Sequence, residues 1–319
     1  MFELIITRPM GFIIDFIYDL VQNYGFAIII FTILIKLILM PLAIKSQKAM
    51  RKQQKLQPFM AELNKKYAND KEKLQMETMK LYKENNISMT GGCLPLLIQF
   101  PILIGLYRVI QKPLTYLLGV DFAVTDAITK ATEIVAKMKT QYPAIIGKLA
   151  DTPIEQIVKN SQIQLSTWSG IVNGATDPWV VNFGFLGLDL SVIPSVSLSY
   201  ILSGQFANLD RVLLILIPII AMFTTWLSMR QSQKMTQMPD NQAAADNPAA
   251  SMGKSMNIMM PIMTGFFSFT LPSGLGLYWI VSNLMQMFQQ YIIDLYFKKK
   301  GDDFDVKLPD KNRKNSKKR

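Results

Sequence analysis

A single lysine, Lys36, interrupts a largely apolar run from Gly25 to Ser46. An apolar run of about 20 residues is long enough to cross a hydrocarbon core of about 30 Å as a helix. At a rise of about 1.5 Å per residue, Lys36 lies roughly 14 Å from Lys45, near the bilayer midplane. A lysine at that depth costs about 2.5–3.5 kcal/mol, so it usually faces a wet cavity or a polar partner. We therefore interpret Lys36 as a functional residue; the alternative is that its ammonium snorkels to the nearer interface.

Further polar side chains lie within or near the ends of other apolar runs. Gln286 is four residues after Ser282 and three after Asn283, so in a helix these residues share one face, with Trp279 one turn earlier. If these faces converge, they line a hydrated slot that admits polar peptide segments without their full desolvation cost. The alternative is a set of scattered hydrogen bonds between helices. The predicted groove residues are Lys36, Gln99, Thr224, Thr225, Trp279, Ser282, Asn283 and Gln286.

The composition places the chain among membrane proteins and excludes several kinds of active site. Half of the 319 residues are hydrophobic, and the mean hydropathy is +0.21. Without any histidine, the chain has no His-based triad and no His-ligated metal, and Cys93 is the only cysteine. A lone cysteine forms neither an intrachain disulfide nor a thiolate cluster. The sequence therefore predicts a polytopic, all-α membrane protein, and we expect it to need no metal or cofactor.

The apolar runs predict five transmembrane helices, which together form a core at residues 25–297. An amphipathic helix at residues 1–24 is expected to lie along the membrane surface, with ordinary packing against the spans as the alternative. Residues 298–319 form a basic tail. The predicted spans are residues 25–45, 94–111, 209–229, 255–271 and 275–297.

The segments between the spans are polar. Residues 46–92 show two amphipathic stripes, which predict a helical hairpin in which Pro58 restarts a helix and Asn69 caps the next. Residues 112–208 read as a long polar connection, with helical patterns at 123–138 and 153–165. Residues 230–254 are low in apolar content and are expected to be flexible.

The basic residues predict the orientation. The net charge is +11, and the excess of Lys and Arg falls in the 46–92 segment, the 230–254 loop and the tail. With five spans these three segments share one side, which the positive-inside rule assigns to the cytoplasm. The amino terminus and residues 112–208 are then outside. The charge is explained by the membrane, and we expect no DNA partner.

Four stretches, in the right order, resemble the YidC/Oxa/Alb family of membrane protein insertases, particularly its five-span bacterial form. They read TILIKLILMPLAIKSQKAMRKQQKLQP, GGCLPLLIQFPILIGLYRVI, FGFLGLDLS and MMPIMTGFFSFTLPSGLGLYWIVSNLMQMFQQY, and the resemblance covers most of residues 10–297. It implies five helices around a hydrophilic groove, with the cytoplasmic hairpin as a mobile lid. The family's groove cation is usually an arginine, where this chain has Lys36, so the planar fork of donors is absent.

The resemblance also implies partners and a function without covalent chemistry, so the chain is expected not to be an enzyme. Such a protein assists the insertion and folding of newly made membrane proteins in the bacterial cell membrane, and it meets nascent chains, lipid, the ribosome and a Sec-type translocon. The residues alone leave two alternatives. One is a small-solute transporter or channel that uses Lys36 as an intramembrane charge. The other is an intramembrane protease that pairs Ser268 or Ser282 with Lys36 as the base.

Overall fold

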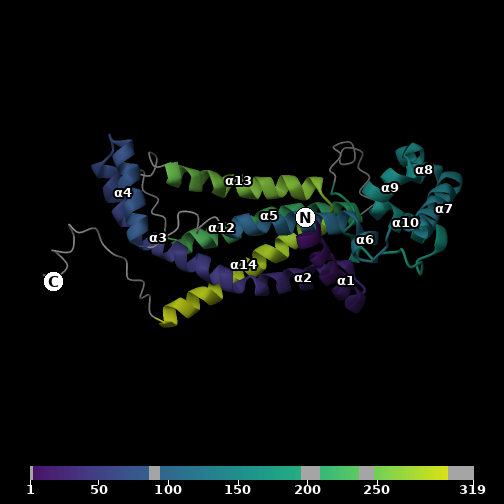
Figure 1. The fold of residues 1–319 in the computed structure, drawn as a ribbon, viewed down its shortest axis with the longest axis horizontal. Coiled ribbons are helices and arrows are strands. Elements are labelled where there is room, and N and C mark those ends of the chain that lie inside the picture. The colour runs from purple at the N-terminus through teal and green to yellow at the C-terminus, as the bar shows by residue number, and fades with distance from the viewer. Residues whose placement is uncertain (1–2, 86–93, 195–208, 237–247, 301–319) are drawn as a thin grey trace. The chain divides into compact units, whose positions relative to one another are not determined.

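The computed structural model describes residues 3–85, 94–194, 209–236 and 248–300, and these are mainly helical (Figure 1). The predicted helical class is therefore confirmed. Strands β1 (Gly184–Phe185) and β2 (Leu188–Asp189) form a short antiparallel hairpin. In chain order the helices are η1 (Glu3–Thr7), α1 (Arg8–Val21), α2 (Tyr24–Ile38), α3 (Met40–Lys66), α4 (Lys71–Glu84), α5 (Leu94–Gln111), α6 (Pro113–Tyr116), α7 (Thr125–Gln141), α8 (Pro143–Ile146), η2 (Gly147–Asp151), α9 (Ile154–Asn160), α10 (Gln162–Asn173), α12 (Leu209–Thr236), α13 (Pro248–Thr270) and α14 (Ser273–Lys300).

The chain divides into two compact units, which are described separately below. Unit 1 comprises Met1–Leu34, Gln99–Ala221 and Thr264–Val281. Unit 2 comprises Ile35–Ile98, Met222–Met263 and Ser282–Arg319.

Membrane-spanning potential is clearest in α12. Within the described residues, Leu213–Ser232 is long and apolar enough to cross a bilayer, and α2 together with Met40–Gln53 of α3 passes the same test as a bent pair. Shorter apolar segments occur at Ile98–Gln111 in α5 and Met259–Thr270 in α13. Length and composition thus support one or two spans, and the number five remains a prediction.

The predicted span at residues 25–45 is two helices instead of one. Helix α2 ends at Ile38, α3 begins at Met40, and the two are bent by 58° at the break. Pro41, near the start of α3, explains the break, because proline has no N–H to give to the carbonyl one turn earlier and its ring crowds that carbonyl. Lys36 therefore lies in the last turn of a helix, two residues before its end.

Helices α3 and α4 pack against each other within unit 2 around a small core of Leu56, Met60, Leu81 and Tyr82. Two details of the prediction were wrong. Helix α3 runs through Pro58 without restarting, and α4 is capped by Asp70, whose side chain accepts a hydrogen bond from the Lys73 amide. Asp70 is the N-cap because it directly precedes the first helical residue, Lys71, so that its carboxylate reaches the third amide of the helix.

The 230–254 segment is more helical than its composition suggested. Helix α12 continues to Thr236 and α13 already begins at Pro248, so the prediction of a flexible segment was wrong for residues 230–236 and 248–254. Alanines and unbranched side chains favour helix even where apolar content is low. Residues 237–247 of that segment, residues 86–92 of the 46–92 segment and residues 301–319 of the tail lie outside the described residues.

Helix α1 has two apolar sides with different surroundings, both in unit 1. One side packs closely on α5 and α6: a Cβ on Gly105 would lie 2.7 Å from Met10 Sδ, and one on Gly11 would lie 3.1 Å from Tyr116. The other side leaves Phe12, Phe16 and Leu20 between 68% and 78% exposed. Packing against other helices is therefore real, and surface anchoring remains a prediction for the exposed side.

The stretch FGFLGLDLS forms the β1–β2 hairpin, which contacts the first residues of α2 and of α14 in unit 1. Leu186 and Gly187 both have positive φ, as a tight two-residue hairpin loop requires. A Cβ on Gly25 would lie only 2.4 Å from the Phe185 ring, so only glycine at position 25 lets the hairpin approach α2 this closely. At the start of α14, the Gly274 amide donates to the Leu190 carbonyl at 3.0 Å.

Within the predicted long polar connection, residues 113–194, here called the accessory domain, form a compact, mainly helical structure (Figure 1). Helix α7 covers the predicted pattern at 123–138, and α9 and α10 cover the one at 153–165. The domain has its own core, in which Ile134, Met138 and Trp168 are buried. The sequence pattern did not predict this core, because α8 and α9 have only 4 and 7 residues and the longer α7 is mostly polar. Residues 195–208 of the predicted connection lie outside the described residues.

Asp177 joins the elements of this domain. Its carboxylate accepts hydrogen bonds from Lys130 Nζ at 3.0 Å, Ser169 Oγ at 2.7 Å and the Trp179 amide at 2.9 Å. Partial burial alone would raise the pKa of Asp177, but these hydrogen bonds favour the carboxylate and hold its pKa below the ordinary value.

We expect Asp177→Asn to lower the free energy of unfolding of the accessory domain by about 1–3 kcal/mol near pH 7. Because the folded pKa is depressed, the stabilisation is present above the unfolded pKa of about 3.9 and is lost as pH falls through the lower folded value. Hydrogen exchange of α10 amides measures this, and the difference between wild type and variant should shrink below about pH 4. The exposed Asp151→Asn is the control; an equal loss in both variants would contradict the assignment.

Candidate functional site

Three of the predicted groove residues are in direct contact inside unit 2. The Asn283 amide nitrogen donates to Thr225 Oγ1 at 2.8 Å and lies 3.3 Å from Thr224 Oγ1. All three residues are at most 9% exposed. The contact joins α14 to α12, so these side chains act as polar links between helices. Such links are common in membrane helices and are what the alternative interpretation expects, whereas a groove role for these three residues stays a prediction.

Lys36 is half-buried, also in unit 2, and α14 fixes its backbone. The Gln289 side chain donates a hydrogen bond to the Lys36 carbonyl at 2.6 Å. The last carbonyls of a helix have no partner within that helix, so the early end of α2 creates the acceptor that Gln289 uses. Ser282 is buried and Gln286 half-buried on the same helix as Gln289.

The remaining two predicted residues, Gln99 and Trp279, belong to unit 1. Gln99 donates to the Tyr278 hydroxyl and so links α5 to α14. The Trp279 ring is stacked on that of Phe267, with centroids 6.5 Å apart. Helix α14 approaches its neighbours closely here, since a Cβ on Gly276 would be 2.5 Å from Ile217 and 2.7 Å from Ser268 Oγ.

An ion-pair cluster in unit 2 was not predicted. Arg51 of α3 pairs with Asp294 of α14, and Lys298 Nζ lies 2.8 Å from the same carboxylate. The Arg51 guanidinium also lies 4.9 Å from the centre of the Phe297 ring. The available signal was Asp294 itself, the only acid in the predicted span at 275–297. Tyr278 and Gln289 were missed as well, although both are polar residues on α14, the helix that carries half of the predicted set.

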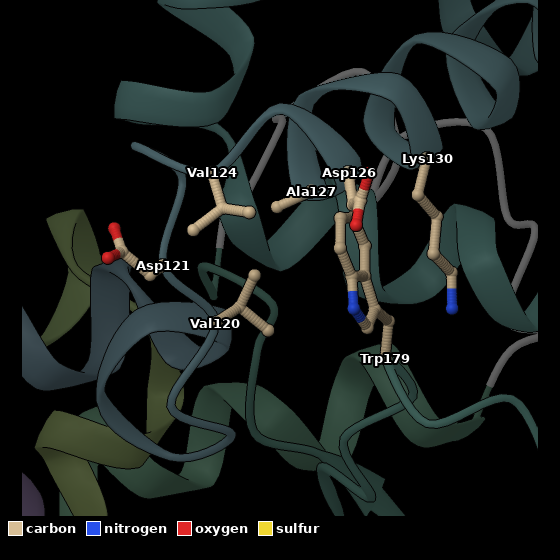
Figure 2. A pocket seen from close by; sticks show the side chains of 7 residues that line it. All are labelled: Val120, Asp121, Val124, Asp126, Ala127, Lys130 and Trp179. Carbon is tan, nitrogen blue, oxygen red and sulfur yellow. The ribbon is translucent and has the colours of Figure 1, made fainter.

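The accessory domain has an open cavity of about 360 Å³ (Figure 2). Its floor is apolar, and Lys130 lies 4.9 Å from the centre of the Trp179 ring at its edge. The described residues contain no group of three or more His, Cys, Asp or Glu that could hold a metal ion. The lining residues are Val120, Asp121, Val124, Asp126, Ala127, Lys130 and Trp179.

Long apolar helices that are linked by buried amide and hydroxyl groups are typical of helical membrane proteins. Residues 16–300 match the family model described as "60Kd inner membrane protein". The chain is 32% identical to the membrane protein insertase YidC of Clostridium perfringens over 92% of this chain and 88% of the relative. It is 30% identical to the YidC insertase of Caldanaerobacter subterraneus over 90% of this chain and 93% of that relative. A 103-residue stretch is 52% identical to the YidC insertase of Syntrophus aciditrophicus, covering 32% of this chain and 19% of that protein.

The chain therefore belongs to the 60Kd inner membrane protein family. Membership confirms the family resemblance, and it implies a polytopic helical protein of the bacterial cell membrane.

Proposed function

We propose that this chain, a membrane protein insertase, lowers the barrier to insertion through a hydrated groove whose fixed charge is Lys36. The function is carried by the family match over residues 16–300 and by insertases that align along most of their own length. An insertase makes and breaks no covalent bond, so the chain is not an enzyme. Its substrates are newly made membrane proteins.

The proposed mechanism uses the predicted groove residues. Lys36 attracts acidic residues of the segment being translocated, and hydrated polar side chains shorten the apolar barrier which that segment crosses. Half-burial of Lys36 and Gln286 supports partial access, whereas the contacts of Asn283 with Thr224 and Thr225 support a structural role for those three. We therefore assign substrate contact chiefly to Lys36 and Gln286.

The proposed topology has the amino terminus and the accessory domain outside and the α3–α4 hairpin and tail in the cytoplasm. The Lys and Arg excess of the hairpin and tail supports it. On that side the hairpin and tail are available to a ribosome or a Sec-type translocon, and rRNA phosphates would suit their charge. The exposed stripe Phe12, Phe16 and Leu20 supports placing α1 along the membrane surface.

The decisive experiment is reconstitution of the purified chain into lipid vesicles. A small membrane protein synthesised in their presence should become protected from external protease several-fold more than with protein-free vesicles. Equal protection in the two preparations would contradict the proposal. Solute flux through the same vesicles without a nascent chain would instead favour a transporter. Cleavage of the substrate would favour a protease. Against a protease, the Ser268 hydroxyl makes no hydrogen bond, within the described residues, to a group that could act as its general base.

A further inference from the structure

The carboxylate of Glu3 in unit 1 is under the electrostatic influence of three basic residues. The Tyr116 hydroxyl donates a hydrogen bond to Glu3 Oε1 at 2.8 Å. This hydrogen bond lowers the pKa of Glu3, partial desolvation opposes it, and the positive charges of Lys112, Arg108 and Arg8 lower it further. Three cations act on a single anion, so the cluster keeps a net positive charge of two.

Close packing between helices holds this cluster together. Met10 of α1 fits against Gly105 of α5, and Tyr116 of α6 fits against Gly11 of α1. Arg8 lies two residues before Met10, and Arg108 lies three residues after Gly105. One tight contact between helices thus fixes the two backbone segments that carry Arg8 and Arg108, and both charges act on the Glu3 carboxylate.

An exposed apolar stripe on α5 leads up to the cluster. Phe100, Ile104 and Tyr107 are 45%, 43% and 37% exposed and lie on one face of the helix. Arg108 is four residues past Ile104, at the end of that stripe. From Phe100 to Arg108 the helix rises about 12 Å, close to half of a hydrocarbon core of about 30 Å. The stripe thus has the length of one leaflet and ends in positive charge.

We propose that Arg8, Arg108 and Lys112 bind the phosphate headgroup of an anionic phospholipid whose acyl chain lies along Phe100, Ile104 and Tyr107. Charge complementarity selects the anionic lipid, since a zwitterionic headgroup brings no net charge to a cluster that carries two positive charges. Guanidinium groups can also bind phosphate oxygens with two parallel hydrogen bonds. The proposal does not depend on which leaflet the cluster faces.

The test compares lipid enrichment in the purified, full-length chain. The protein is equilibrated with mixed micelles of phosphatidylcholine and a few per cent phosphatidylglycerol, and native mass spectrometry counts the bound lipids. We expect wild type to enrich phosphatidylglycerol and Arg8→Gln/Arg108→Gln to reduce this enrichment about tenfold. The control Lys139→Gln/Lys159→Gln removes the same charge from exposed positions of the accessory domain and should leave the enrichment unchanged.

Glu3→Gln gives the opposite prediction. Removing the one anion of the cluster should increase enrichment about threefold or more. This variant also tests the proposal if the double arginine variant does not fold. A phosphatidylglycerol enrichment in Glu3→Gln equal to that of wild type would overturn the proposal. An equal loss of enrichment in the control Lys139→Gln/Lys159→Gln would show that the net charge of the protein determines lipid binding, and it would overturn the proposal. Displacement of the lipid by millimolar inorganic phosphate would assign the cluster to free phosphate and overturn the lipid assignment.

Discussion

Lys36→Ala is expected to reduce insertion of a substrate with an acidic residue in its translocated segment by about tenfold, whereas Lys36→Arg should retain most of the activity. A charge at the bilayer centre costs about 2.5–3.5 kcal/mol. If the lysine offsets about half of this cost for the passing carboxylate, its loss is worth about 1.4 kcal/mol, which corresponds to a factor of ten. The measurement is the initial rate of protease protection in reconstituted vesicles.

Two controls separate the groove charge from general effects. The substrate with its acid replaced by a neutral residue should be inserted almost equally by wild type and Lys36→Ala. Lys45→Ala removes an exposed lysine nine residues further along the same stretch and should leave both rates unchanged. Unimpaired insertion of the acidic substrate by Lys36→Ala would remove Lys36 from the mechanism.

Sequence reasoning predicted helices wherever apolar periodicity was strong, and it failed where local rules compete. Pro41 breaks the first predicted span, yet Pro58 is accommodated inside α3. Both prolines lack an N–H, but Pro41 lies in the first turn of α3, directly after the break, and Pro58 lies inside the helix, and the sequence alone does not distinguish these two outcomes. The accessory domain escaped prediction for a related reason. Its helices α8 and α9 are too short to show a clear period, although they contribute to one core.

For the site, sequence reasoning found residues on one helix but not their partners. Helical spacing correctly put Ser282, Asn283 and Gln286 on α14. It could not show that Asn283 contacts Thr224 and Thr225, because helix pairing depends on the whole bundle. The same limit hid Gln289, whose contact with the Lys36 carbonyl exists only because α2 ends early.

Asp294→Ala should markedly lower the stability of unit 2, because one carboxylate pairs with two cations, Arg51 and Lys298. The side chains of Arg51 and Asp294 are only 13% and 18% exposed, so their attraction is screened less than that of a surface pair. We expect the free energy of unfolding to fall by about 1–3 kcal/mol. The pair joins α3, the first helix of the hairpin, to α14, so the loss should also speed proteolytic cleavage of the hairpin. Thermal unfolding and limited proteolysis in detergent measure the two effects.

A charge exchange tests whether the interaction is specific. Arg51→Asp/Asp294→Arg restores the pair in reverse and should recover part of the stability that Asp294→Ala loses, whereas Arg51→Asp alone places two carboxylates together and should be the least stable variant. Recovery will be incomplete because Lys298, four residues after position 294 on the same helix, would then face an arginine. Lys298→Ala is the matched control: its side chain is 68% exposed, and exposed pairs contribute at most about 1 kcal/mol. If the exchange is no more stable than Arg51→Asp, the contact between α3 and α14 does not depend on this ion pair.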